Sequence, residues 1–221
     1  MKIEKMTLVE LGKIYDSMQL QYGDKSLKSI LFGGCIDSPD ICFVFMNPTG
    51  KNVASYPEWT GMRAPWIGTK NIWQLLSEVG VFDEKLSNQI KNMKPKEWTP
   101  EFAREVYAYI ETKKIFITNL GKCTQADATL ISNKIYSQYL PYFEREMQIV
   151  NPRKIILFGN QVSTVFLGQP ISVSKCRKKY FDKKIGNQVF KCFPVFYPVG
   201  NGRINIDKAI EDIRWIIENS F

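Results

Sequence analysis

Apolar residues along the chain fall into four short runs, each followed by a polar or glycine-containing turn. Runs of this length that end at such a turn are typical of buried strands. The four predicted strands are residues 41–46, 114–119, 154–158 and 189–196. Between them, apolar residues recur three or four positions apart, the spacing of one face of a helix.

These helical patterns predict six helices. Thr7 and Glu10 form a capping box at the start of the first, because each side chain can bond the backbone N–H of the other residue. Four more helices are predicted at residues 71–79, 100–112, 133–150 and 159–166. The apolar face of the last helix consists of isoleucines: Ile206, Ile210, Ile213 and Ile217.

Strands that alternate with helices predict right-handed crossovers and a parallel sheet that is covered on both faces. We therefore expect an α/β fold, a single domain over residues 1–221 that forms a three-layer α/β/α sandwich around a mainly parallel, four-stranded sheet. Ligands of such sheets bind beyond the carboxyl ends of the strands. The loops that begin at Asn47, Asn119 and Tyr197 leave those ends, so we expect them to meet in one crevice.

The composition is that of a folded soluble protein, with 44% hydrophobic and 24% charged residues. The apolar runs are too short to cross a bilayer, and the first residues lack the layout of a signal peptide. We expect a cytoplasmic monomer without a membrane partner, associated with the nucleoid if the cell is prokaryotic.

Lysine and arginine outnumber aspartate and glutamate by 30 to 22, which gives a formal charge of +8. Such an excess attracts polyanions, including nucleic acid, at low salt. Solvated lysine-rich surfaces explain it equally well, so the charge alone does not decide between the two interpretations.

Chemistry in this chain has to proceed without imidazole, because the sequence contains no histidine. This excludes Ser-His-Asp and Cys-His catalysis and removes a common zinc ligand. The five cysteines include no C-x-x-C pair. We interpret them as core thiols and expect neither a metal nor any other cofactor.

Five segments resemble, in collinear order, motifs of the uracil-DNA glycosylase superfamily. The resemblance spans residues 41–206, and its Asn-Pro-Thr-Gly motif is closest in style to the mismatch-specific and single-strand-selective branches. The segments are FMNPTG (45–50), RAPWIG (63–68), ITNLGKC (117–123), IILFG (155–159) and FYPVGNGR (196–203).

The resemblance implies a monofunctional DNA-repair glycosylase that flips a uracil or other deaminated base and cleaves its N-glycosidic bond, leaving an abasic site. It assigns water placement to Asn47, because a neutral amide can orient water but cannot act as a general base. The implied base-binding residues are Trp66, which stacks on the base, Asn119, which reads its edge, and Met46.

Each of the main positions also has a purely structural interpretation. Asn47 precedes a proline, which is typical of a turn, and Asn119 could cap the next loop. Trp66 could be a core aromatic residue. Trp59 and Trp73 are close enough along the chain to take the stacking role, so the choice of Trp66 rests on the motif.

The resemblance places DNA contacts in the loops at residues 48–50 and 198–203, and the composition of residues 175–184 suggests a further contact. The last motif enters the minor groove, where its glycines permit close approach to phosphate and Arg203 inserts or pairs with a phosphate; Arg203 is otherwise a surface cation. Residues 175–184 hold six basic side chains with aromatic neighbours, which suit either phosphate contact or a solvated hairpin. The predicted DNA-binding residues are Pro48, Thr49, Gly50, Pro198, Gly200, Asn201 and Arg203.

Two positions depart from the family pattern. Many relatives carry a histidine where this chain has Tyr197; a phenol can also donate a hydrogen bond to the departing base, so we count Tyr197 as catalytic. Lys122-Cys123 is similar to the iron–sulfur branch, but Tyr139 stands where the next cluster cysteine falls, so we expect no cluster. Lys122, near the expected pocket, leaves a Schiff-base lyase step open.

The missing histidine motivates an alternative function, a catalytically weak or inactive DNA-lesion or single-strand binding module of the same fold. A nucleotide-binding α/β protein is a third interpretation, which the lack of a G-x-G-x-x-G motif and of a P-loop disfavours. We expect DNA as the partner under the first two interpretations.

Overall fold

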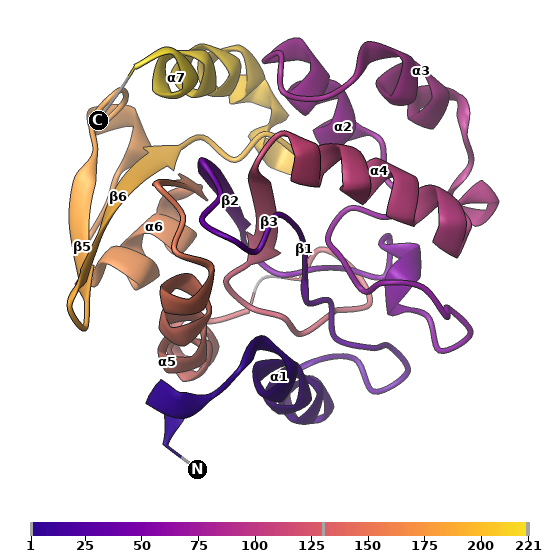
Figure 1. Ribbon diagram of the computed structural model, residues 1–221, viewed down its shortest axis with the longest axis horizontal. Helices are drawn as coiled ribbons and strands as arrows, with labels where there is room; N and C mark the ends of the chain where they lie inside the picture. Colours follow the sequence, from indigo (N-terminus) through magenta and orange to yellow (C-terminus); the bar gives the residue numbers. More distant parts are fainter. Residues whose placement is uncertain (1, 130, 220–221) are drawn as a thin grey trace.

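Six strands form one sheet in the computed structural model, which describes residues 2–129 and 131–219 (Figure 1). The strand order is β1-β3-β2-β4-β6-β5. The four central strands lie where the apolar runs predict them and pair in parallel. They are β2 (Ile41–Phe45), β3 (Ile115–Asn119), β4 (Lys154–Phe158) and β6 (Gln188–Val195).

The expected count of four strands is corrected to six, because an antiparallel strand is added at each edge. β1 (Phe32–Gly34) pairs with β3, and β5 (Phe181–Ile185) pairs with β6. β1 is three residues long and contains two glycines, and β5 lies within the basic stretch and alternates half-buried with exposed residues. Short or charged strands are typical of sheet edges, and neither shows an apolar run in the sequence.

Helices cover both faces of the sheet and give the expected three layers (Figure 1). One face is covered by α2 (Asn71–Glu78), α3 (Glu84–Asn92), α4 (Pro100–Thr112) and α7 (Ile206–Glu218). The other is covered by α1 (Leu8–Tyr22), α5 (Asn133–Val150) and α6 (Asn160–Leu167). Among the described residues, no helix is long and apolar enough to cross a bilayer.

Local sequence explains where the first helix begins and why another was not predicted. The capping box between Thr7 and Glu10 is present at the start of α1. α3 was not predicted, since its nine residues are mostly polar and only two of them, Ser87 and Ile90, are buried. Short 3₁₀ helices complete the chain: η1 (Ile3–Lys5), η2 (Val53–Ser55), η3 (Pro95–Glu97), η4 (Val173–Lys175) and η5 (Gly200–Asn205).

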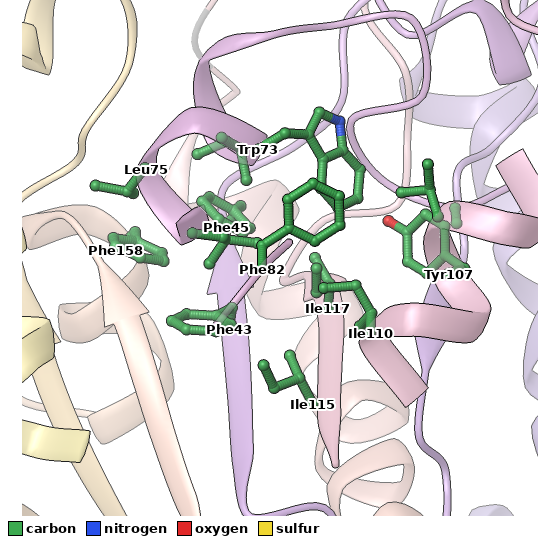
Figure 2. Packing of buried hydrophobic residues seen from close by; sticks show 14 of the residues in the cluster. Phe43, Phe45, Trp73, Leu75, Phe82, Tyr107, Ile110, Ile115, Ile117 and Phe158 are labelled. Carbon is green, nitrogen blue, oxygen red and sulfur yellow. The ribbon is translucent and has the colours of Figure 1, made fainter. Parts of the chain in front are cut away.

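The central strands are rich in apolar residues because each contributes to two cores. Successive side chains of a strand point to opposite faces, and both faces are covered here. Phe43 and Phe45 of β2 pack with Phe158 of β4 beneath α2 and α4, at ring-centroid distances of 5.9 and 4.5 Å (Figure 2). Cys42 and Val44 lie in the core beneath α1, α5 and α6.

Candidate functional site

A pocket with a volume of about 210 Å³ opens beyond the carboxyl ends of β2, β3 and β6. Asn47, Asn119 and Tyr197 line it together, so the three loops that the sequence places at these ends do meet in one crevice. The other predicted site residues on its walls are Trp66, Pro48, Thr49 and Gly200. The pocket also has walls that the sequence did not single out: Lys51, Asn52, Pro65, Thr69, Asn71, Ala128 and Val199.

Asn119 is the last residue of β3 and pairs in register with Phe45 of β2. The loop that follows is fixed by two backbone hydrogen bonds, from Leu120 N–H to the Phe45 carbonyl (2.8 Å) and from Gly121 N–H to the Met46 carbonyl (3.0 Å). The Asn119 side chain is 2% exposed, and its Nδ2 has no hydrogen-bond partner in the described part of the chain. A buried donor left unpaired costs about 1–3 kcal/mol, so this amide is suited to bond a ligand.

Trp66 is held in an unusual backbone conformation, with φ at 67°. Its carbonyl accepts hydrogen bonds from Thr69 Oγ1 (2.8 Å) and from Trp73 Nε1 (3.1 Å). Its ring meets Phe45 edge-on at 4.8 Å, and its buried Nε1 has no partner among the described residues. Left-handed backbone at a bulky residue is strained and persists only where the surroundings enforce it, which is common at functional sites.

Trp66, and neither of its two neighbouring tryptophans, lines the pocket. Trp73 is fully buried in the core, and Trp59 Nε1 donates to the Met62 carbonyl at 3.0 Å. Of the three tryptophans considered for the stacking role, the structure thus places at the pocket the one that the motif indicates, Trp66.

Both ends of the Asn47 side-chain amide are hydrogen-bonded. Oδ1 accepts a hydrogen bond from the Tyr136 hydroxyl (2.9 Å), and Nδ2 donates to the carbonyl of Pro48 (3.2 Å). Tyr136 lies on α5 and is fully buried. The side chain is thus fixed at the pocket wall, with one lone pair of Oδ1 left for a further donor.

The loop after Asn47 is joined to the loop after β3. Gly50 N–H donates to the Gln125 carbonyl (2.8 Å), and Gln125 N–H donates to the Pro48 carbonyl (3.1 Å). The Gly50 amide, which was predicted to approach DNA, is therefore used inside the protein, and Gly50 lies off the pocket wall. Pro48 and Thr49 lie on it.

The loop after β6 folds tightly onto itself. A Cβ atom at Gly202 would lie 2.0 Å from the carbonyl oxygen of Tyr197, so only glycine fits there. Tyr197 is half-buried, and burial raises the pKa of its phenol above the usual value. The phenol is therefore a neutral hydrogen-bond donor near pH 7.

Of the other predicted residues in this loop, only Gly200 lines the pocket. Pro198 is buried, whereas Asn201 and Arg203 are exposed. Ile204, which the sequence did not single out, is 88% exposed beside Arg203. An exposed isoleucine next to a cation gives this loop both an apolar and a charged tip.

The family model described as the uracil DNA glycosylase superfamily matches residues 32–213 of the 221. This chain belongs to the uracil DNA glycosylase superfamily. The matched region begins at β1 and contains every residue that lines the pocket. Membership indicates a function of the DNA glycosylase type. A comparison with curated protein sequences gave no significant match.

Two residues that the sequence placed at the site lie elsewhere in this superfamily member. Met46 is half-buried and packs against the core beneath α1, α5 and α6, off the pocket wall. Lys122 is fully buried, with Nζ 2.9 Å from Oε1 of Glu146 and bonded to Thr118 Oγ1. Burial lowers the pKa of Lys122, and the Glu146 carboxylate opposes this. The structure therefore corrects the placement of Lys122 near the pocket and removes it as the Schiff-base amine.

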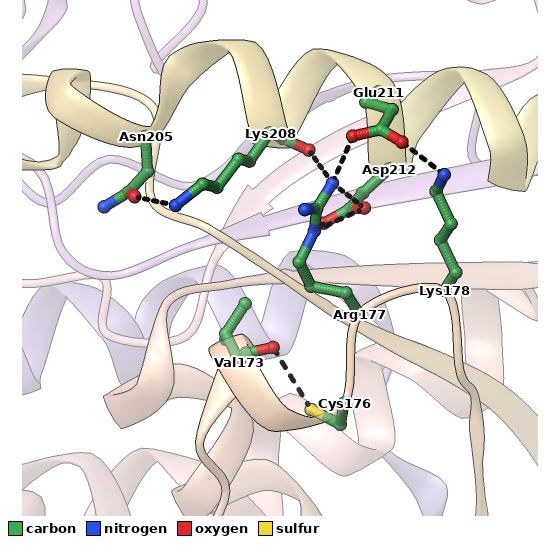
Figure 3. A network of polar contacts seen from close by, with 8 residues as sticks. All are labelled: Val173, Cys176, Arg177, Lys178, Asn205, Lys208, Glu211 and Asp212. Atoms are coloured by element: carbon green, nitrogen blue, oxygen red, sulfur yellow. Dashed lines mark hydrogen bonds and ion pairs between the residues drawn. The ribbon is translucent and has the colours of Figure 1, made fainter.

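The basic stretch at residues 175–184 is partly neutralised by acidic neighbours. Arg177 Nε lies 3.0 Å from Asp212 Oδ1, and Lys178 pairs with Glu211 (Figure 3). Lys183 pairs with Glu144 at 2.8 Å. Arg177 and Lys178 thus hold the loop before β5 against α7, and Lys183 holds β5 against α5, which favours the structural interpretation of these three of the six cations.

The cysteines show no arrangement that suits a metal cluster. All five are free thiols, and Cys123 is buried. Across residues 2–129 and 131–219, no group of three or more cysteine, aspartate and glutamate side chains is placed to hold a metal ion.

Proposed function

We propose that this protein is a monofunctional DNA glycosylase that hydrolyses the N-glycosidic bond of a flipped uracil or other deaminated base. The observation that carries the proposal is the unpaired, buried Nδ2 of Asn119 in the same pocket as Asn47 and Trp66. Leaving that donor unpaired is costly in the free protein, and a base with an acceptor on its edge would supply the missing partner.

The pocket provides the groups that the reaction needs. Trp66 stacks on the flipped base, and Asn119 bonds its edge. The free lone pair of Asn47 Oδ1 accepts a hydrogen bond from a water molecule and orients its oxygen toward C1′ of the sugar. As the C1′–N bond breaks, its electrons leave with the base, and Tyr197 donates a hydrogen bond to the charged base. The water oxygen then bonds C1′, and the proton that this water loses passes to the departing base anion, so that a hydroxyl remains on the sugar and the base leaves neutral.

The loop after β6 would contact the DNA itself. Asn201, Arg203 and Ile204 are exposed in the loop that contributes Val199 and Gly200 to the pocket wall. Arg203 suits a phosphate, and an apolar side chain such as Ile204 can enter the stack from the minor groove and occupy the space of the flipped base.

A second candidate function is a binding module of the same fold that holds damaged or single-stranded DNA without cleavage. Tyr197 favours this candidate, because burial raises its pKa and so makes the phenol a weaker acid. A weaker acid stabilises the growing charge of the leaving base less.

Excision assays with a panel of substrates distinguish the two functions. Labelled single- and double-stranded oligonucleotides that contain uracil, hypoxanthine or xanthine are incubated with excess protein and then cleaved with alkali. A glycosylase gives alkali-sensitive product that forms far more slowly in Asn47→Ala, with a residual rate that long incubations can measure, and the panel names its base. Binding of these DNAs without product from any of them would instead establish the binding module.

A further inference from the structure

Tyr136 lies on α5, in the core on the α1, α5 and α6 side of the sheet, and contacts Asn47 of the pocket wall from there. Its hydroxyl donates to Asn47 Oδ1 at 2.9 Å, although 89 residues separate the two along the chain. Tyr136 is fully buried and does not line the pocket, so it does not touch a ligand there. Burial raises the pKa of this phenol, and the nearby Tyr197 raises it further, so the hydroxyl remains a donor in neutral solution.

The ring of Tyr136 is seated against the loop that follows β3. A Cβ atom at Gly121 would lie 3.0 Å from Cε1 of Tyr136 and 3.1 Å from Cδ1 of Ile131, which is closer than such contacts normally are. The Gly121 N–H also donates to the Met46 carbonyl at 3.0 Å. Tyr136 is thus packed where the loops that carry Asn47 and Asn119 join.

The Tyr136 hydroxyl and the Pro48 carbonyl together hold the Asn47 amide in one of its two orientations: the carbonyl, which can only accept, sets the orientation, and the phenol fixes Oδ1 in place. In the observed orientation Oδ1 faces the phenol and Nδ2 faces the Pro48 carbonyl. The reverse orientation would place Oδ1 against the Pro48 carbonyl, two acceptors in contact, and would present N–H groups where Oδ1 now stands.

We infer that Tyr136 is a positioning residue, which holds the Asn47 amide in the orientation that leaves an oxygen lone pair free to accept a hydrogen bond from the attacking water. This inference rests on the proposed glycosylase function. Tyr136 acts only through Asn47, so its effect on the reaction should exist only while Asn47 is present.

A double-mutant cycle measures that dependence. Tyr136→Phe removes one hydrogen bond to Oδ1, and we expect single-turnover excision to slow about tenfold. The DNA concentration at half-maximal rate should not change, because the phenol touches no ligand. In an Asn47→Ala background Tyr136→Phe should cause no further slowing. Equal slowing in both backgrounds would show a merely structural role and overturn the inference.

Tyr139 offers a matched control on the same helix. It is also fully buried, and its hydroxyl lies beside the Cys123 thiol without a hydrogen-bond partner among the described residues. Tyr139→Phe removes the same atom from α5, and excision should continue at the wild-type rate. A tenfold loss in Tyr139→Phe as well would attribute the effect to helix packing instead of the bond to Asn47.

The orientation of Asn47 can also be read without any reaction. In ¹⁵N-labelled protein, the side-chain NH₂ signals of Asn47 are assigned by their absence in Asn47→Ala. We expect these signals to shift in Tyr136→Phe and to stay in place in Tyr139→Phe. Unshifted signals in Tyr136→Phe would overturn the inference whatever the activity. Shifted signals in a protein that excises no base would support the positioning contact and refute only the proposed function.

Discussion

Asn119 and Lys122 are three residues apart, and both are almost fully or fully buried. They differ in whether the nitrogen of the side chain has a hydrogen-bond partner within the protein. Nδ2 of Asn119 has no partner among the described residues and lies at the pocket wall. Nζ of Lys122 bonds both Glu146 and Thr118, and lies above the rings of Tyr15 and Phe143.

The comparison separates polar groups that serve the structure from those available to a ligand. A buried charge is tolerated when its partners are built into the protein, as around Lys122, where Glu146 also accepts hydrogen bonds from Thr118 (2.7 Å) and Tyr15 (2.9 Å). A buried donor whose partner is missing keeps its cost until something binds. Among the described residues, groups of the second kind occur at Asn119 and Trp66, both on the pocket wall, and at the Tyr139 hydroxyl, which does not line the pocket.

Breaking the satisfied network should have the largest effect. Lys122→Met leaves the Glu146 carboxylate buried without its cation, and we expect the free energy of unfolding to fall by about 3–5 kcal/mol. Urea denaturation measures this loss. Adding Glu146→Gln should restore much of the stability, because no buried charge then remains and the amide can still bond the Tyr15 and Thr118 hydroxyls. A loss below about 1 kcal/mol in Lys122→Met would contradict the assignment of this ion pair to the core.

Substituting Asn119, whose buried amide is unpaired, should give the opposite pattern: a loss of excision without a loss of stability. Asn119→Leu keeps the size of the side chain but removes a donor that has no partner, so the free energy of unfolding should be unchanged or slightly higher. Excision should fall about 10- to 100-fold in kcat/KM, because the base loses its contact. Destabilisation as large as that of Lys122→Met would mean that the amide serves the fold.

The tryptophan at the same wall allows a graded test. Stacking of a base on an aromatic ring is worth about 1–3 kcal/mol, so Trp66→Ala should weaken binding to lesion-containing DNA about 10- to 100-fold. Trp66→Phe, which keeps a ring, should stay within about threefold of wild type in a fluorescence anisotropy titration. Trp59→Phe, outside the pocket, is the control and should bind as wild type does.

The surface ion pairs of Glu211 with Lys178 and Arg177 should contribute least to the free energy of unfolding, and their contribution should depend on pH. Hydrogen bonds from Lys178 and Arg177 lower the pKa of Glu211 to about 2, from an ordinary value of 4.5. Because the folded-state pKa is the lower one, the stabilisation is present above pH 4.5 and is lost as the pH falls toward 2. Glu211→Gln should thus be less stable than wild type near pH 7, by a small amount for such an exposed pair.

Urea denaturation of both proteins at lower pH tests the direction of this pH dependence. The difference between wild type and Glu211→Gln should shrink through the window from 4.5 to 2. Burial raises the pKa of Asp212 and the charge of Glu211 raises it further, so the comparison is repeated in an Asp212→Asn background, in which Asp212 no longer titrates. A difference that grows on acidification would contradict the pairing of Glu211.

The central fold could be predicted because its determinants are local. Each parallel strand contains a run of apolar residues, because the middle of the sheet is buried on both faces, and a helix with one apolar stripe follows it along the chain. β1 escaped prediction because Phe32-Gly33-Gly34 has no apolar pattern and forms a strand only by pairing with β3. α3 escaped because most of its residues are polar and few are buried.

The candidate site could be predicted only where a loop follows a strand. Asn47, Asn119 and Tyr197 were found because they follow the carboxyl ends of parallel strands. Tyr136 could not be found, because its position on an apolar helix face is that of an ordinary core residue and its partner lies 89 residues away. The sequence likewise could not show that Lys122 turns away from Asn119 to pair with Glu146.

The central claim is that Trp66 and Asn119 receive the base, and the most direct test is to observe the unpaired Nε1 and Nδ2 donors of these two side chains while DNA is bound. An oligonucleotide whose uracil is attached to a 2′-fluoro sugar resists cleavage, and it is titrated into ¹⁵N-labelled protein with the tryptophan and asparagine side-chain signals assigned by substitution. We predict that the Trp66 Nε1 and Asn119 Nδ2 signals shift on binding, whereas the Trp59 signal, whose N–H is already bonded to Met62, does not. DNA that binds without moving either the Trp66 or the Asn119 signal would contradict the claim that these groups receive the base.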